Sequence, residues 1–217
     1  MAEIFESEFN QMLSGKFKKA KRKINPKTIN LSSTRITPLF SPKNNIISEH
    51  IISLVQNSKS YVYIPAFVIT NEKLADELVR AFKRGIDVKI ILDATGTSKT
   101  KNKVNNLRSQ NIPVKIENYA GKIHSKSIII DDKYIIAGSM NFTKSGENYN
   151  DENVLIIEDT RLAKYYKGFF EYLWNKIPDI YLKRYVNPES KESIGSCADG
   201  IDNDYDGKID NKDPSCL

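Results

Sequence analysis

One short apolar run restricts the possible folds more than any other part of this sequence. Residues 88–92 read Val-Lys-Ile-Ile-Leu and stand between two aspartates, so an extended segment here presents apolar side chains on both faces. A strand that is buried on both faces belongs to a sheet with helices on either side. The run therefore predicts an α/β protein built around a central sheet.

The segments around this run alternate between the two-residue spacing of strands and the spacing of amphipathic helices. That alternation predicts right-handed crossovers and a mainly parallel or mixed sheet. A chain of 217 residues can bury one such core with a short appendage to spare. Predicted strands cover residues 61–64, 87–93, 114–116, 126–130, 134–137 and 154–157, and predicted helices cover 46–55, 71–82, 99–110 and 161–176.

The sequence divides into five parts. They are a terminal helix (1–16), a basic linker (17–36), the main α/β domain (37–180), a second linker (181–196) and an Asp-rich module (197–217). Residues 1–12 align without gaps on residues 162–173, with apolar positions matched. This echo indicates either a chance likeness between two amphipathic helices or the remnant of a preceding repeat, in which case the chain is the second half of a longer protein.

The charge of the chain is unevenly distributed. The net charge is +6, but residues 197–217 hold six Asp against two Lys, so the remainder carries +10. Residues 16–27 contain seven cations and no acid. A basic body suits a polyanionic partner such as nucleic acid, although a solvated lysine-rich surface gives the same composition. No apolar stretch is long enough to span a membrane, and the first residues do not resemble a signal peptide.

Polar side chains gather around two neighbouring predicted strands. His124 and Lys126 are two residues apart at the start of one strand, so they project from the same face. Ser139 and Asn141 repeat this spacing just after the next strand. Four polar groups can therefore converge on one small anion, and a phosphoryl group is the natural candidate.

Displacement at a phosphodiester needs a nucleophile, neutralisation of the nonbridging oxygens and an acid for the leaving oxygen. We predict that His124 attacks phosphorus to form a covalent phosphoramidate, while Lys126 holds the phosphate oxygens. Glu152 is expected to accept a bond from the second ring nitrogen of His124; a solvated loop carboxylate is the alternative. Asp131 faces the other side of the strand, so we expect it to organise the following turn and not to carry a proton.

The leaving oxygen needs a second titrating group. The other histidine, His50, lies among isoleucines on an apolar helix face and is expected to be a packing residue. The acid must then come from a second copy of His124, either across the two-fold axis of a homodimer or from a missing repeat. The two imidazoles would titrate as a coupled pair.

These residues resemble the signature of the phospholipase D superfamily, which is His-x-Lys-(x)4-Asp followed by Gly-Ser-x-Asn. Residues 122–158 look especially like the small bacterial endonucleases with a single motif, and the resemblance covers residues 38–177. It implies an α/β sandwich around a mixed sheet, a histidine nucleophile, a second histidine as general acid and no metal for catalysis. The catalytic residues it implies are His124, Lys126, Asp131, Ser139, Asn141 and Glu152, with Gly138 completing the motif and Lys126, Ser139 and Asn141 on the phosphate.

The Asp-rich module carries a second pattern. Its carboxylates fall at the positions of an EF-hand-like loop, with a glycine for the sharp turn, and the module resembles the Asp-rich calcium repeats of extracellular proteins such as thrombospondin type 3 repeats. We predict a structural Ca²⁺ ion, a solvated acidic tail being the alternative. The predicted ligands are Asp202, Asp204, Asp206, Lys208, Asp210 and Asp213.

Two cysteines, Cys197 and Cys216, bracket this module. An isolated pair around a small loop predicts a disulfide and an oxidising compartment, with two free thiols as the alternative. We therefore expect the protein to be extracellular or in the cell envelope. Because no export signal is present, this expectation requires a chain truncated at its N-terminus.

Three functions fit the sequence. The leading prediction is a metal-independent phosphodiesterase that cleaves DNA or RNA, with two copies of the motif forming one site. A phospholipid hydrolase or phosphatidyltransferase would attack the same class of bond, and an apolar acyl groove would distinguish it. The third is a nucleic-acid-binding module whose half-site is inert alone.

Overall fold

A computed structural model describes residues 1–217 and contains one eight-stranded mixed sheet, in the order β1-β2-β8-β7-β6-β3-β4-β5. The strands are β1 (Ile29–Leu31), β2 (Thr34–Phe40), β3 (Tyr61–Ala66), β4 (Asp87–Leu92), β5 (Val114–Ile116), β6 (Ser127–Ile130), β7 (Tyr134–Gly138) and β8 (Asn153–Glu158). The α-helices are α1 (Ala2–Leu13), α2 (Ile52–Gln56), α3 (Glu72–Lys83), α4 (Ala94–Ser98), α5 (Lys101–Ser109), α6 (Lys144–Asn148) and α7 (Thr160–Lys176).

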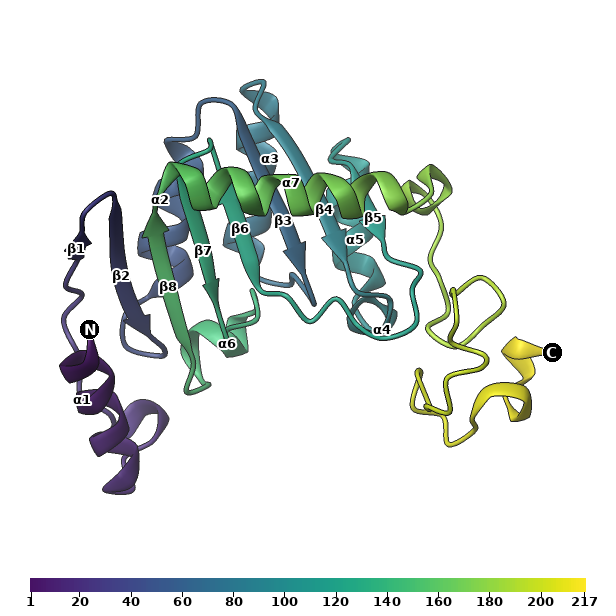
Figure 1. The fold of residues 1–217 in the computed structure, drawn as a ribbon, viewed down its shortest axis with the longest axis horizontal. Coiled ribbons are helices and arrows are strands. Elements are labelled where there is room, and N and C mark those ends of the chain that lie inside the picture. Colours follow the sequence, from purple (N-terminus) through teal and green to yellow (C-terminus); the bar gives the residue numbers. More distant parts are fainter.

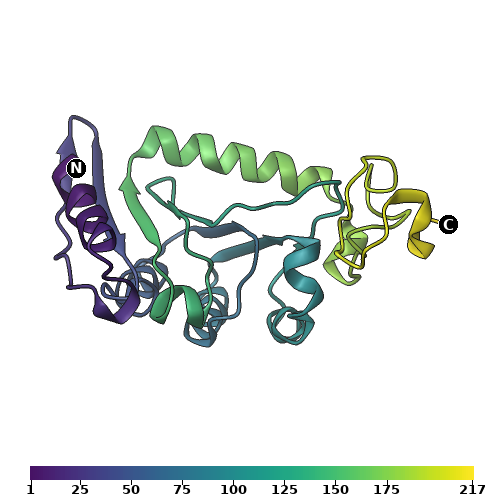
Figure 2. The same ribbon diagram turned by 90° about the horizontal axis from the view of Figure 1, so that it is seen from below.

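The sheet is the middle layer of a sandwich. Helix α7 runs across one face, and α2, α3 and α5 cover the other (Figure 1), an arrangement that the perpendicular view of Figure 2 also shows. Strands β3, β4 and β5 are parallel to one another, and the other neighbouring pairs are antiparallel. The predicted α/β sandwich around a mixed sheet is confirmed.

The central strands form the core because their side chains are apolar on both faces. Every residue of β3 is buried, and Val88, Ile90, Ile91 and Leu92 of β4 are at most 1% exposed. Helix α3 begins as predicted, since the side chain of Asn71 accepts a bond from the backbone N–H of Leu74. These elements belong to one continuous core cluster, and they hold the strand ends that carry the site.

A buried lysine joins the end of α7 to the edge strand β5. Lys115 is 2% exposed, and its Nζ donates to the carbonyl oxygens of Trp174 (2.8 Å) and Ile177 (2.6 Å). The same ammonium lies 2.7 Å from a carboxylate oxygen of Asp179. A cation is favourable here because the last carbonyls of a helix carry partial negative charge.

Both predicted linkers contain structure. Residues 17–36 include a 3₁₀ turn at Lys18–Ala20, all of β1 and the start of β2. Residues 181–196 bury Glu189 completely and pair Ile194 with Tyr119 in an isolated bridge. The linker predictions rested on charge and on a lack of periodicity, and neither shows that a segment packs against a domain.

The two ends of the described chain lie at opposite flanks of the sheet (Figure 1). Helix α1 lies beside β2, where the ring of Phe5 packs edge-to-face on Phe40 with centroids 5.2 Å apart. The Asp-rich module lies beyond β5. Both segments of the internal echo, 1–12 and 162–173, fall largely within helices, α1 and α7. None of the helices has the length and apolar character that crossing a bilayer requires.

Candidate active site

The site forms at one end of three neighbouring strands of the sheet, β6, β7 and β8. Strand β6 begins there, β7 ends there and β8 begins there, because the three are antiparallel. Ser127 pairs with Ala137, and Gly138 pairs with Val154. Lys126 directly precedes β6, where it pairs with Ala66 in an isolated bridge, and Ser139 directly follows β7. The end of β7 and the start of β8 lie near the short helix α6 at the bottom of Figure 1.

Lys126 is an almost buried cation. The residue is 8% exposed, and its Nζ donates to the carbonyl oxygen of His124 (2.9 Å) and lies 5.6 Å from the centroid of the Phe67 ring. Burial lowers the pKa of Lys126, and the charges of Glu152 and Asp93 oppose that shift. An ammonium held in this way is a fixed positive charge that a phosphate can approach.

His124 is exposed, next to this cation. Its ring packs edge-to-face on Phe67, with centroids 5.1 Å apart, and its side chain makes no hydrogen bond within the chain. Its backbone N–H donates to the carbonyl oxygen of Lys122 (2.9 Å). The ring nitrogens are therefore free to meet a substrate or a second copy of the chain.

The structure does not contain the predicted bond between His124 and Glu152. Glu152 Oε2 instead accepts from the hydroxyl of Ser139 (2.6 Å), and its Oε1 accepts from the side chain of Asn150 (3.2 Å). The strand order explains the difference, because β7 lies between β6 and β8. His124 precedes β6 and Glu152 precedes β8, and these strands are two strand spacings apart, which is about 10 Å.

Asn141 and Gly138 complete the polar edge. Oδ1 of Asn141 is buried and accepts no hydrogen bond, which makes it a free acceptor within the site. Gly138 lets β7 and β8 approach closely, since a Cβ at this position would lie 2.1 Å from the carbonyl oxygen of Asn153. A glycine is therefore required directly before Ser139.

Asp131 stands at the opposite end of β6 from Lys126, away from the other motif residues. Its carboxylate accepts backbone N–H bonds from Lys59 (2.7 Å), Ser60 (2.8 Å) and Tyr61 (3.0 Å). It occupies a left-handed conformation with φ of 56°. Asp131 thus anchors the start of β3, whereas the sequence analysis expected it to organise the turn that follows it.

Sequence reasoning missed a buried pair of acids at the ends of β4 and β5. Asp93 is fully buried and caps α4 through Gly96 (2.7 Å), while Glu117 is 2% exposed and accepts from the backbone N–H groups of Ala94 (3.2 Å) and Tyr119 (2.9 Å). Burial, followed by the charge and hydrogen bond of Asp93, raises the pKa of Glu117 to about 7. A carboxylate directly after a buried strand was the available sequence signal.

The basic segment of residues 16–27 borders the site. Lys21 is buried and pairs with Glu8 and, at 2.8 Å, with Asp151, so it is not free to bind phosphate. Lys19 is exposed to solvent, and its Nζ lies 5.7 Å from the centroid of the Tyr149 ring. Next to this segment, a hollow of about 480 Å³ is lined by Phe5, Phe9, Met12, Phe40 and Glu152 among others.

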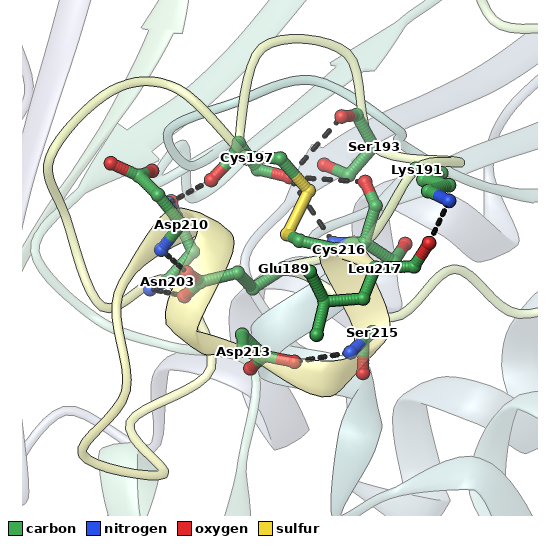
Figure 3. Close-up of a disulfide and its surroundings, with 12 residues drawn as sticks. Glu189, Lys191, Ser193, Cys197, Asn203, Asp210, Asp213, Ser215, Cys216 and Leu217 are labelled. Atoms are coloured by element: carbon green, nitrogen blue, oxygen red, sulfur yellow. Dashed lines mark hydrogen bonds between the residues drawn. A yellow bond between two sulfur atoms is a disulfide. The ribbon is translucent and has the colours of Figure 1, made fainter.

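The Asp-rich module is closed by the predicted disulfide. Cys197 and Cys216 are bonded, with Cα atoms 5.6 Å apart (Figure 3). Four of the predicted metal ligands, Asp202, Asp204, Asp206 and Asp213, fall into two acidic groups that share Asp204. The carboxylate of Asp210 instead binds backbone N–H groups elsewhere, and the ammonium of Lys208 pairs with Asp206.

Comparison with known proteins identifies the family. A family model described as cardiolipin synthase, PLD-like domain, matches residues 51–174. The chain is 33% identical to a phospholipase D of Rickettsia prowazekii over 136 residues, which are 63% of this chain and 66% of that protein. It is 26% identical to a mitochondrial cardiolipin hydrolase of Xenopus laevis over 168 residues, covering 73% of this chain and 80% of that one.

Solved structures agree with this assignment. Nuc of Salmonella typhimurium, a phospholipase D family member, superposes with a TM-score of 0.60 at 27% identity and covers 67% of this chain and 97% of Nuc. NucT of Helicobacter pylori gives a TM-score of 0.61 at 23% identity, over 66% of this chain and 98% of NucT. The chain therefore belongs to the phospholipase D superfamily, as the His-x-Lys motif predicted.

Proposed function

We propose that this chain is a phosphodiesterase that cleaves DNA or RNA, with His124 as a covalent nucleophile and no metal ion in the reaction. The exposed imidazole of His124, free of side-chain partners and next to the nearly buried ammonium of Lys126, is the observation that carries this proposal. A neutral imidazole is a nucleophile, and a fixed cation beside it attracts the phosphate.

The reaction has two steps. A ring nitrogen of His124 bonds to phosphorus while the bond to the leaving oxygen breaks and that oxygen takes a proton. Water then attacks phosphorus and gives up a proton to the group that protonated the leaving oxygen, the P–N bond breaks, and the imidazole is regenerated. Lys126 offsets the charge on the nonbridging oxygens, and the hydroxyl of Ser139, which donates to Glu152 in the free protein, rotates to reach the phosphate.

The proton for the leaving oxygen comes from a second copy of the site. His50 is partly buried on the helical segment 46–56, and burial lowers its pKa, so it is a poor proton donor near neutral pH. The edge that carries His124 and Ser139 is exposed, so another chain can meet it. In a homodimer, or in a longer chain with two repeats, one imidazole attacks while its counterpart, charged, donates the proton.

Charge favours a nucleic acid as the substrate. Outside the Asp-rich module the chain carries +10, and the basic segment borders the Glu152 side of the site through Asp151 and Tyr149. If lysine and arginine side chains bind the phosphates of a nucleic acid, its affinity for the protein should fall steeply as the salt concentration rises. The disulfide supports our proposal that the protein works in an oxidising compartment, outside the cytoplasm or in the cell envelope.

A phospholipid substrate is the second candidate. The hollow lined by Phe5, Phe9, Met12 and Phe40 reaches Glu152 and offers an apolar surface to an acyl chain. The names of the curated relatives, phospholipase D and cardiolipin hydrolase, favour the same substrate class.

Nicking of supercoiled plasmid DNA in excess chelator tests the proposal. We expect His124→Ala to lower the rate by at least about 10³-fold, because the covalent route is lost, while DNA binding persists. His50→Ala is the matched control and should nick at the wild-type rate. Equal nicking by His124→Ala and wild type would refute the assignment of the nucleophile.

Vesicles of cardiolipin separate the two substrates. If the chain acts on nucleic acid, Phe9→Asp in the hollow leaves nicking unchanged, and no phosphatidic acid forms from the cardiolipin. Formation of phosphatidic acid that His124→Ala abolishes and Phe9→Asp reduces, without nicking by wild type, would establish the lipid candidate instead.

A further inference from the structure

Five carboxylates in and beside the Asp-rich module form an acidic cluster made of two overlapping groups of three. They are those of Glu189, Asp202, Asp204, Asp206 and Asp213. Asp204 belongs to both groups of three whose oxygens lie within 4.8 Å of one another, so the two groups are joined through this one carboxylate. A single lysine pairs with the cluster, at its rim, where Lys208 Nζ lies 3.5 Å from Asp206.

One member of the cluster is deeply buried and has one carboxylate oxygen without a hydrogen-bond partner. Asp213 is 1% exposed, and its Oδ1 accepts from the backbone N–H of Ser215 (2.5 Å). Its Oδ2 is buried and accepts no hydrogen bond. Ionised groups are rarely buried unless they are paired or bind a metal ion. The orphan oxygen therefore points to a cation that completes the cluster.

We propose that the acidic cluster binds one Ca²⁺ ion, and that the bound ion holds Tyr205 against the loop that precedes His124. The donors are carboxylate oxygens, which suit a hard cation, and both cysteines are consumed in the disulfide. Calcium accepts six to eight oxygens in flexible geometry, whereas magnesium keeps several waters and uses one or two carboxylates. A cluster of five carboxylates therefore favours calcium.

Glu189 distinguishes this site from the EF-hand-like spacing. It comes from the segment before the disulfide loop, and its oxygens also accept from the backbone N–H groups of Asn203 (2.7 Å) and Asp210 (2.5 Å) (Figure 3). The carboxylate of Asp210 instead accepts from Asp199 (3.2 Å) and Gly200 (3.1 Å). In the proposed ligand set, Glu189 takes the place of the predicted ligand Asp210. Because Glu189 lies before the disulfide loop, the bound ion would join the module to the segment that leads into it.

Tyr205 links the site to the nucleophile. It stands between the ligands Asp204 and Asp206, and its hydroxyl accepts from the ammonium of Lys122, which also lies 4.1 Å from the ring centroid. Lys122 in turn accepts the backbone N–H of His124 through its carbonyl oxygen. Fixing the backbone on both sides of Tyr205 therefore restrains the loop of residues 118–125.

Calorimetric titration of the full chain with CaCl₂, after removal of metal by chelator, tests the site. We expect one saturable site in wild type, at least about tenfold weaker binding in both Glu189→Gln and Asp204→Asn, and a change below about threefold in the control Asp210→Asn. Thiol titration verifies that each variant keeps its disulfide. Glu189→Gln could weaken Ca²⁺ binding only by disturbing the bonds of Glu189 to the backbone of Asn203 and Asp210. Asp204→Asn is the second variant because it leaves those bonds in place.

The ligand set is overturned if wild type shows no saturable binding up to about 5 mM, beyond the range of extracellular calcium modules. It is equally overturned if Asp210→Asn weakens binding as much as Asp204→Asn does, or if Mg²⁺ binds as tightly as Ca²⁺. These outcomes are independent of whether the chain is a nuclease.

Hydrogen–deuterium exchange tests the link to the loop. Saturating Ca²⁺ should slow exchange in residues 118–125 of wild type by at least about fivefold relative to chelator, because local opening becomes less favourable. Tyr205→Ala should bind Ca²⁺ with an affinity within about threefold of wild type but lose this protection. Unchanged exchange in wild type, or equal protection in Tyr205→Ala, would refute the coupling.

Discussion

Replacement of Asp131 separates a structural role from a catalytic one. Its carboxylate holds three backbone N–H groups at the start of β3, of which that of Tyr61 is partly buried and those of Lys59 and Ser60 are exposed. Water replaces the exposed bonds, so we assign about 1.5 kcal/mol to Tyr61 and about 1 kcal/mol to the other two together. Alanine at a φ of 56° adds about 1 kcal/mol of backbone strain.

Asp131→Ala should therefore lower the free energy of unfolding by roughly 3.5 kcal/mol, which lowers Tm by roughly 7–14 °C in a protein of this size. Asp131→Asn keeps the left-handed conformation and one acceptor oxygen, so its Tm should fall by less. Circular dichroism during heating measures both. The control is Asp132→Ala, which has a similar φ of 49° but removes only the bond from Tyr61 Oη and a 3.8 Å contact with Lys167.

The nicking assay completes this test. If Asp131 only anchors β3, Asp131→Asn keeps the wild-type pH profile of kcat/KM at temperatures where it is folded. A profile that moves while Tm stays at the wild-type value would make Asp131 a proton carrier and refute the structural reading. A Tm of Asp131→Ala no lower than that of Asp132→Ala would refute the energies assigned to the three bonds.

Two further predictions concern stability. Because the folded chain raises the pKa of Glu117 from 4.5 to about 7, the contribution of Glu117 to stability is fully present below pH 4.5 and falls by about 3 kcal/mol as the pH rises from 4.5 through 7; Glu117→Gln should make stability in urea unfolding fall less between pH 5 and 8 than in wild type, and an unchanged difference would contradict the assignment. Gly138→Ala should cost more than about 3 kcal/mol through its clash with Asn153, whereas the control Gly168→Ala, with open space around it in α7, should gain about 0.5–1 kcal/mol; chemical denaturation measures both, and equal effects would refute the close approach.

The sequence predicted the elements of the core well, because their patterns are local. The run at 87–93 became β4, and Asn71 caps α3 as expected. It could not predict the order of the strands, which depends on contacts between distant segments. That order, with β7 between β6 and β8, is the reason why Glu152 meets Ser139 and not His124.

The candidate sites show the same division. His124 and Lys126 follow from a two-residue spacing on one strand, which a sequence displays directly. Glu189 and Glu117 carry no such spacing, since each acts through chain segments that are brought together only by folding. Asp210 fits the spacing of a calcium loop, yet in the fold its carboxylate accepts from the backbone N–H group of Gly200 (3.1 Å).

The buried ammonium of Lys115 has a mechanical consequence. The Lys115 side chain, on β5, donates to the carbonyl oxygens of Trp174 and Ile177 at the end of α7 and pairs with Asp179. These contacts join the end of the helix to the edge strand of the sheet. Tension applied to the chain beyond this point is passed to the edge of the sheet and not along the helix axis. Pulling on that part of the molecule should peel β5 before it uncoils α7.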